Sequence, residues 1–502
     1  MRGSRSRSSG GLRFGSAAGR WVIAASVLGS GIAAIDATVV GVALPAIGRE
    51  FHVGVAALQW VVSGYFLTLA SLLLLSGSLS DRFGRKRLFS IGVVGFAAAS
   101  AACGLAPSAG FLIAMRVLQG IGGALLVPGS LAILEASFAP SDRGPAIGAW
   151  AGLGAVATAA GPLLGGYLIS AASWRWIFFL NLPVAVVVLV VAARHVPESK
   201  DPSAAPHVDV AGASSAIVGL GALAFALIEG PGLGWSSIGI VAALALAISA
   251  SGVFASVELR SRQPMLPLRM FRERQFSSTN AITFLMYASV GGAFFLVPVQ
   301  LQIGSSYSPL EAGAALLPTT IIELIFSARS GRLASRIGPR RQLIAGPFIF
   351  AVSLVLLTRI PGHHSYWVYV LPAVTMMGIG VATFVAPLTA TVMESAGPEH
   401  AGLASAINND VARIGSLVAV SVLPAIAGIT GTTYLHPTEL SAGFRTAMIV
   451  SAIGCGLGGI VAVFTVRNPS RKAEPAASYA HCAIDAPPLR VSLPGAAKAD
   501  LS

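Results

Sequence analysis

The sequence is poor in charge and in lysine, and each shortage excludes a class of protein. Only 11% of the 502 residues are charged, against about 25% in soluble chains, which excludes a large soluble enzyme. The four lysines are Lys86, Lys200, Lys472 and Lys498, and none of them follows a glycine. A nucleotide-binding P-loop needs Gly-Lys-Ser/Thr, so any work must draw on an ion gradient or on the substrate's own gradient.

Cysteine is equally scarce. Cys103, Cys455 and Cys482 lie far apart, and this spacing predicts neither a disulfide framework nor a zinc site. The eight histidines fall in expected loops, helix ends and tails. We therefore expect no metal, no cofactor and no enzymatic activity. The net charge of +13 does not indicate a nucleic-acid partner, because the cations are spread over short loops between apolar runs.

Long apolar runs are what the sequence has in abundance. It is 55% hydrophobic, and it contains fourteen runs of roughly 20 residues, the length that crosses a bilayer as a helix. The runs lie near 21–47, 57–76, 88–106, 109–136, 145–169, 176–194, 210–229, 237–257, 276–302, 309–328, 342–359, 367–393, 401–429 and 444–466. They predict an all-α integral membrane protein. With fourteen spans most of the 33 Lys and Arg residues fall on one side, which places both termini in the cytoplasm.

The runs also suggest how the chain is divided. We expect disordered cytoplasmic tails at both ends, because the first is rich in Arg, Ser and Gly and the second in Pro, Ala and Ser. The expected parts are a tail at 1–20, a six-helix bundle at 21–195, cytoplasmic linkers with two extra helices at 196–275, a second six-helix bundle at 276–467 and a tail at 468–502.

A basic stretch between the second and third runs occurs twice. The first copy contains Gly77, Asp81, Arg82, Gly84 and Arg85, followed by Lys86 and Arg87. The second copy, which lies between the tenth and eleventh runs, contains Gly331, Ser335, Arg336 and Gly338 at the same offsets. Glycine permits a tight reversal between helices, so both copies predict a solvated loop. The repetition indicates an internal repeat, as in many secondary transporters.

Charge inside an apolar run is costly and usually functional, and three such residues are candidates for proton coupling. Asp36 is in the first run, Arg116 in the fourth and Glu323 in the tenth. The alternatives are structural: Asp36 as a hydrogen-bonded residue, Arg116 in an ion pair or bound to carbonyl groups, and Glu323 reaching toward the membrane surface or a cation. Asp410 and Arg413 are three residues apart, hence on one helix face, and we expect them to form an ion pair.

The fifth run contains Gly161, Pro162, Gly165 and Gly166. Small residues let helices approach closely, and proline bends a helix. Any packed helix pair could use such a pattern.

Taken in order, these motifs resemble the major facilitator superfamily, and in particular its fourteen-helix drug:proton antiporter branch. The resemblance covers about residues 20–467 and includes Asp36-Ala-Thr-Val-Val, Arg116-Val-Leu-Gln-Gly and the glycines of the fifth run. It implies two six-helix bundles plus two additional central helices. It also implies proton-coupled export of amphipathic or cationic drugs by alternating access, with Asp36 and Arg116 in proton coupling. Export of one dedicated metabolite, lipid or antibiotic is the alternative.

The implied partners are a drug-like small molecule, protons and the lipid bilayer of the cell membrane, with the chain acting as a monomer. Aromatic residues of the apolar runs are candidates for the substrate cavity, although core packing explains each of them equally well. These candidates are Trp60, Tyr65, Phe284, Phe295 and Phe384. In the outward-open state we expect Asp81 to bridge to the positive end of the helix that begins near Ala401.

Overall fold

The computed structural model describes residues 11–201, 209–261, 264–360, 362 and 365–468. Within these residues fourteen helical segments are long and apolar enough to cross a bilayer, which confirms the fourteen runs read from the sequence. The spans are α1 (Ala17–Phe51), α2 (Val55–Phe83), α3 (Arg85–Gly104), α4 (Ala109–Ser137), α5 (Pro140–Ala171), α6 with α7 (Trp176–Phe179 and Asn181–His195), α8 (Val210–Leu233), α9 (Ile238–Arg260), α10 (Arg274–Val299) with the turn Gln300–Gly304, α11 with α12 (Pro309–Ala315 and Leu317–Ile337), α13 (Arg340–Leu357), α14 (Leu371–Ser395) preceded by Tyr366–Val370, α15 (Ala401–Ile426) and α16 (Pro437–Thr465).

The start of the described chain is more ordered than its composition suggests. Residues 11–16 belong to the stretch for which the sequence predicts a disordered tail. Instead, the Leu12 amide donates to the Ser137 carbonyl oxygen over 2.8 Å, and its own carbonyl accepts from Ala139. The Ser16 side chain then caps α1. The remaining residues of the two expected tails, 1–10 and 469–502, lie outside the described residues.

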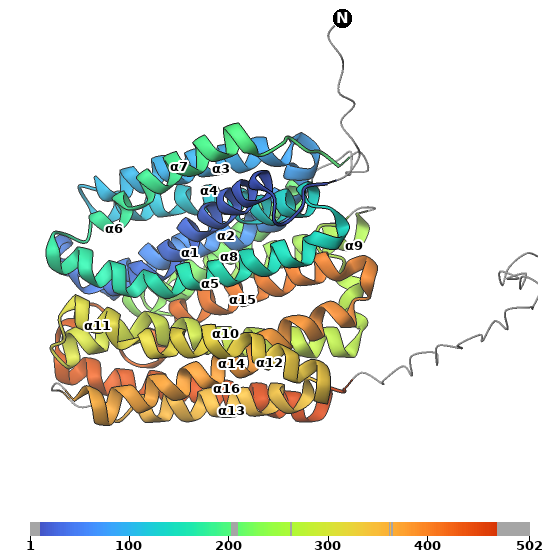
Figure 1. Ribbon diagram of the computed structural model, residues 1–502. Coiled ribbons are helices and arrows are strands. Elements are labelled where there is room, and N and C mark those ends of the chain that lie inside the picture. The colour runs from blue at the N-terminus through green and yellow to red at the C-terminus, as the bar shows by residue number, and fades with distance from the viewer. Residues whose placement is uncertain (1–10, 202–208, 262–263, 361, 363–364, 469–502) are drawn as a thin grey trace, which may run out of the picture. The chain divides into compact units, whose positions relative to one another are not determined.

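The spans form two sets, which we call the N-terminal set (α1–α7) and the C-terminal set (α10–α16). In the N-terminal set α3 and α2 pack on α4, and α1 packs on α5; in the C-terminal set α13 packs on α14 and α16, and α10 packs on α15. Figure 1 shows the blue and cyan helices of the first set gathered apart from the yellow and orange helices of the second. The sets meet where α1 contacts α10, α2 contacts α15 and α5 contacts α11.

Helices α8 and α9 pack on each other, and α8 also contacts both α2 and α15. The extra pair therefore covers the seam between the two sets. The Trp60 indole of α2 donates to the Glu229 carboxylate of α8 over 2.9 Å, which ties the pair to the N-terminal set.

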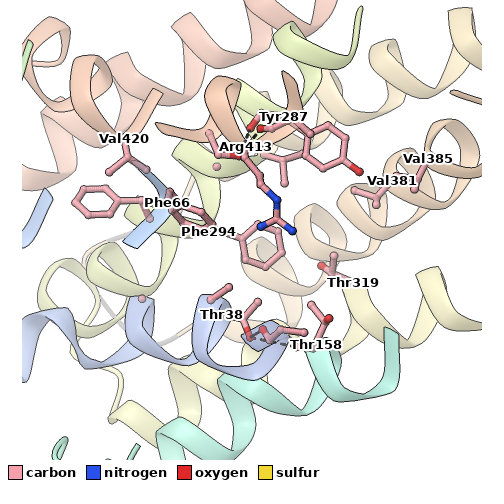
Figure 2. Close-up of a pocket in the computed structure, with 18 of the residues that line it drawn as sticks. Thr38, Phe66, Thr158, Tyr287, Phe294, Thr319, Val381, Val385, Arg413 and Val420 are labelled. Atoms are coloured by element: carbon pink, nitrogen blue, oxygen red, sulfur yellow. Dashed lines mark hydrogen bonds between the residues drawn. The ribbon is translucent and has the colours of Figure 1, made fainter. Parts of the chain in front are cut away.

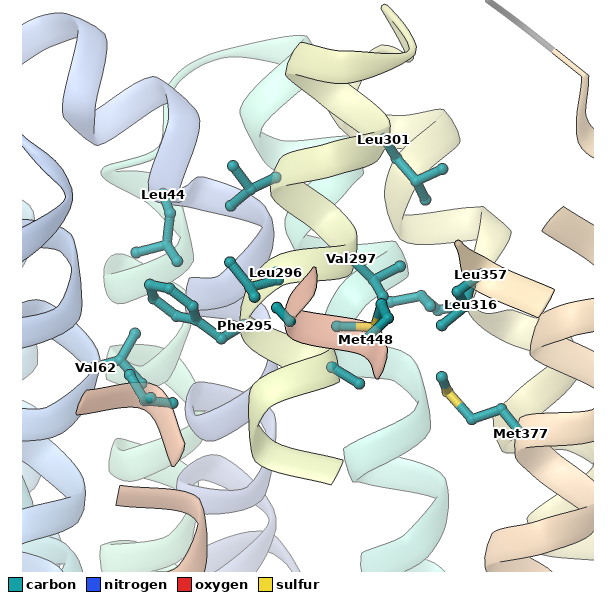
Figure 3. Packing of buried hydrophobic residues seen from close by; sticks show 14 of the residues in the cluster. Leu44, Val62, Phe295, Leu296, Val297, Leu301, Leu316, Leu357, Met377 and Met448 are labelled. Carbon is teal, nitrogen blue, oxygen red and sulfur yellow. The ribbon is translucent and has the colours of Figure 1, made fainter. Parts of the chain in front are cut away.

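The two sets are closed against each other at the end that carries the α1–α2 loop. There the Tyr434 hydroxyl donates to the Val53 carbonyl oxygen over 2.9 Å, and the Val55 amide donates to Gly431 over 2.8 Å. The Gln59 amide donates to the carbonyl oxygens of Val420 and Ser421. One buried apolar cluster spans both sets, and Figure 3 shows its members Phe295 and Leu296 of α10 facing Leu44 of α1. This end excludes water.

Candidate functional site

The most deeply buried charges of the N-terminal set form one ion pair. Asp36 of α1 is 0% exposed and Arg116 of α4 is 1% exposed, and the Arg116 guanidinium is bound to the Asp36 carboxylate. A second nitrogen of Arg116 is also occupied, since Nε donates to the Val61 carbonyl over 3.0 Å. A buried charge is tolerated only when it is paired and hydrogen-bonded, and both conditions hold here.

Neutral polar groups complete this cluster. The Gln119 amide donates to Asp36 Oδ1 over 2.9 Å, and its oxygen accepts from Arg116 over 2.7 Å. The Asn181 amide of α7 approaches the same carboxylate oxygen at 3.4 Å. Tyr65 lies under the guanidinium, whose carbon is 4.4 Å from the ring centre. Four helices thus hold Asp36 in one position, and both of its oxygens carry hydrogen bonds.

A cavity of about 400 Å³ lies between the two sets. Its wall is mostly apolar and aromatic, with threonine and asparagine side chains and two charged residues, Glu323 of α12 and Arg413 of α15. Ala37 and Thr38 also belong to the wall, so Asp36 directly precedes cavity-lining residues of α1. This cavity is the candidate substrate site.

Arg413 extends into the cavity rather than away from it. Figure 2 shows its guanidinium reaching from α15 toward Phe294, Thr38 and Thr319. Its Nε has no hydrogen-bond partner among the described residues. The ion pair that the sequence predicts between Arg413 and Asp410 is not formed, because Asp410 lines a different cavity on a neighbouring face of α15. One alternative from the sequence was that Glu323 reaches toward the membrane surface. In the structure its side chain lies half-buried in the wall of the central cavity.

The five candidate aromatic residues are divided. Phe295 and Phe384 line the cavity. Tyr65 is 0% exposed beneath Arg116, and Trp60 binds Glu229 of α8. Phe284 is half-buried on α10 and is not among the residues that line the cavity. Three of the five candidates are therefore packing residues in this structure, whereas Tyr287 and Phe294, which the sequence did not single out, line the cavity.

The glycine motif of the fifth run lies where three helices meet. A side chain at Gly161 would collide with Thr38 of α1, and one at Gly165 would collide with Val39. A side chain at Gly166 would meet the backbone of α11 at Leu310. Close approach therefore requires small residues at these positions. Pro162, the remaining residue of the motif, lines the cavity. The motif therefore contacts helices of both sets and also forms part of the cavity wall.

The repeated basic stretch has the same turn in both copies. The sequence predicts a loop over the whole stretch, but Gly77 to Phe83 belong to α2 and Gly331 to Ile337 belong to α12. In the first copy the reversal consists of Gly84 alone, with φ +117°. In the second copy it consists of Gly338, with φ +84°, and Pro339. Only glycine adopts this conformation without strain. The helices run further than the apolar pattern because they continue beyond the bilayer core into water.

In the first copy Asp81 binds Arg85, one turn on, over 2.7 Å. The first two amides of α3 after Arg85, those of Lys86 and Arg87, donate over 3.1 Å to the carboxylate of Glu198. The acid that caps this helix start is Glu198, which the sequence gave no reason to choose. Among the described residues Asp81 forms neither a hydrogen bond nor an ion pair with the start of α15.

The family is shown by sequence comparison. The model of the Major Facilitator Superfamily matches residues 26–420, and again residues 279–490. The chain therefore belongs to the Major Facilitator Superfamily, a family of membrane transporters rather than enzymes. It is a multi-pass membrane protein.

Several curated relatives are named for resistance and export. The chain is 34% identical to the tetracenomycin C resistance and export protein of Streptomyces glaucescens, over 80% of this chain and 74% of that protein. It is 34% identical to the methylenomycin A resistance protein of Streptomyces coelicolor, over 90% and 93%. It is 36% identical to the multidrug resistance protein Stp of Mycobacterium tuberculosis, over 80% and 75%.

Solved structures support the fold. The chain resembles a bacterial homologue of the human lysosomal transporter Spinster, with a TM-score of 0.63 at 17% identity, over 90% of this chain and 99% of that one. A peptide transporter of the POT type matches with a TM-score of 0.65 at 14% identity, over 90% and 96%. At these identities the likeness concerns the fold alone.

Proposed function

We propose that the chain exports amphipathic drug-like compounds, antibiotics among them, across the cell membrane in exchange for protons. The carrying observation is the cavity of about 400 Å³ that both helix sets share, with aromatic walls and two charged residues. Such a site takes an apolar body and fixes it with a few polar contacts. The relatives named for antibiotic resistance and export support this choice of substrate class. One chain holds the whole cavity, which favours a monomer as the working unit.

We infer that residues 21–195 and 276–467 rock as two bodies about this cavity, with 196–275 between them. The charge distribution of the sequence assigns the turns at Gly84 and Gly338 to the cytoplasmic side. The closed end near Val53 and Tyr434 then faces outward, and we infer an inward-facing state. Release to the outside requires the bonds from Gln59 to α15 to break.

Asp36 is our candidate for the residue that takes up the coupling proton. Protonation removes the negative charge that holds Arg116, and the buried guanidinium must then find other acceptors. The resulting shift of α1 passes to Thr38 in the cavity wall, since Thr38 also contacts the Thr158 carbonyl of α5. Proton uptake and the shape of the substrate site are thereby linked through a single turn of one helix. Glu323, in the cavity wall itself, is the second candidate.

Inverted membrane vesicles with an acidic interior test this proposal. We expect wild-type protein to accumulate cationic ethidium, puromycin and an uncharged compound inside the vesicles. Asp36→Asn should abolish accumulation of all three, because the coupling step is common to them. The matched control is Glu439→Gln, which removes the same charge from an exposed position at the start of α16. Unchanged accumulation by Asp36→Asn would remove this residue from coupling and would leave Glu323 as the residue to test.

The names of the relatives favour one alternative. Several refer to a single antibiotic, including the puromycin resistance protein pur8 of Streptomyces alboniger, which is 32% identical over 81% of this chain and 82% of that protein. A dedicated exporter would accumulate one compound of a panel and ignore the others, with the same dependence on Asp36.

A further inference from the structure

A second cavity, of about 500 Å³, lies beside α15 on a face next to the one that lines the central cavity. Its walls come from α2, α15, the extra helices α8 and α9, and the segment 265–271 that follows α9. Most of the lining is apolar: Leu74, Leu220, Leu223, Ile248, Phe254, Met265, Leu266, Phe271, Ile407, Val411 and Ile414. The extra pair α8–α9 thus forms one wall of a half-open pocket, with Ile248 of α9 75% exposed.

Two polar side chains in this apolar wall lack partners. Asp410 of α15 is 7% exposed, and its Oδ1 has no hydrogen-bond partner among the described residues. Ser71 of α2 is also 7% exposed, and its Oγ has none either. Both residues line the cavity. A buried carboxylate without a partner is costly, and carboxylates inside membrane spans are a sign of function.

The nearest cation along the chain does not neutralise Asp410. Arg413 follows on the same helix, but it lines the central cavity and forms no ion pair within the described part of the chain. The other polar lining residues, Ser215 and Ser251, already donate to carbonyl oxygens of their own helices. Asp410 and Ser71 are therefore the two groups of this wall that are open to a ligand.

We propose that this cavity is a second ligand site, which binds a compound with an apolar body and one protonated primary amine. The ammonium group donates to the Asp410 carboxylate and to Ser71 Oγ, and the apolar body lies along the α8–α9 wall. A charge-assisted hydrogen bond of this kind is among the stronger ones. A phospholipid is the poorer occupant, because its phosphate would be repelled by the Asp410 carboxylate, even where its headgroup carries an amine. The proposal gives the extra helices a role, and it concerns binding alone, so it does not depend on the proposed export.

Photolabelling of the purified protein in detergent, with no proton gradient, tests this site. The probe is decylamine that carries a diazirine on its alkyl chain, and labelled positions are mapped by mass spectrometry. We expect wild-type adducts on α8, α9 or residues 265–271, and about tenfold fewer there in Asp410→Asn, the effect of losing one charged hydrogen bond. Glu323→Gln, which changes a carboxylate of the central cavity instead, should keep these adducts. Decanol with the same diazirine should label weakly and equally in wild type and Asp410→Asn.

A second variant keeps the proposal testable if Asp410→Asn is poorly folded. Ala216→Phe retains Asp410 and places a ring in the cavity that Ala216 lines, so it should also lose the adducts. If Ala216→Phe or a folded Asp410→Asn is labelled as strongly as the wild-type protein, the proposal is overturned. Decanol labelling as strong as that of decylamine would overturn it as well, since the cavity would then accept any apolar chain, that of a lipid included.

Discussion

The two helix sets treat buried charge in opposite ways. In the N-terminal set Asp36 and Arg116 neutralise each other, and Gln119 and Asn181 supply further hydrogen bonds to the carboxylate. In the C-terminal set the corresponding charges line cavities. Glu323 and Arg413 belong to the central cavity and Asp410 to the second one, and none of them forms an ion pair within the described residues.

The difference indicates a division of labour. A closed pair responds to one small event, such as arrival of a proton, because that event removes the charge that holds the pair together. Open charges suit a ligand that brings its own charge into the cavity. The two copies of the repeated turn also differ in whether they contain an ion pair. Asp81 and Arg85 pair in the first copy, whereas Ser335 and Pro339 stand at these positions in the second.

The largest expected effect comes from breaking the closed pair. Arg116→Ala leaves the carboxylate of Asp36 buried without its cation, and loss of one partner of a buried pair costs about 3–5 kcal/mol. Arg413→Ala removes an arginine with no ion pair in the described chain, so its cost should stay below about 1 kcal/mol. Denaturant unfolding in mixed micelles measures both free energies. Equal losses in the two variants would mean that the contrast between the sets has no energetic basis.

The next effect concerns the charge of the substrate. Glu323→Gln should weaken binding of cationic compounds about tenfold or more, and Arg413→Gln should do the same for anionic ones, because each loses one charged hydrogen bond. Uncharged compounds should bind both variants as they bind wild type. Equilibrium binding of matched cationic, anionic and neutral fluorophores measures this. Asp36→Asn is the comparison, since its defect should appear in gradient-driven transport of every class. Parallel losses for all three fluorophores in Glu323→Gln would place that residue in packing instead.

The fold followed from the sequence because each apolar run is as long as a bilayer is thick. The ends of the helices did not follow. Gly77 to Phe83 are polar enough to suggest a loop, yet they continue α2, since a helix that leaves the membrane can persist in water. Residues 11–16 are bound to the α4–α5 junction by backbone hydrogen bonds. Such bonds cannot be predicted from a pattern of side chains.

The site was predictable only in part. The sequence indicated Asp36 and Arg116 as candidates, because an isolated charge inside an apolar run is rarely incidental. The pairing of Asp410 with Arg413 was wrong for a geometric reason. Residues three apart on a helix differ by about 60° around its axis, and the two cavities lie on neighbouring faces of α15, so the two side chains enter different cavities. Which aromatic residues line the cavity depends on helix rotation, which the sequence pattern does not determine.

The smallest effect expected from the comparison lies in the repeated turns. In this structure Asp81 binds Arg85, and its side chain is 37% exposed; such an exposed pair contributes about 0.5 kcal/mol or less. We propose that Asp81 exchanges this partner for the positive N-terminal end of α15, near Ala401, when the transporter opens outward. A carboxylate at a helix start is stabilised by about 0.3–1 kcal/mol. Removal of the Asp81 charge loses this contact and the weaker pair with Arg85, so the ratio of inward- to outward-facing protein should rise at most a few-fold.

Labelling of a cavity residue from the cytoplasmic side measures that population. Asn409 lines the central cavity, and Asn409→Cys, with Cys482→Ser to remove the cysteine of the tail, gives a position that a membrane-impermeant maleimide reaches in the inward-facing state. Cys103 and Cys455 are buried and should react slowly. We expect Asp81→Asn to raise the labelling rate a few-fold, because the contact that favours the outward-open state is lost. Ser335→Ala, the same position in the second copy, should leave the rate unchanged. If the two variants label alike, Asp81 has no part in the exchange between states, and the difference between the two turns concerns only the local pair with Arg85.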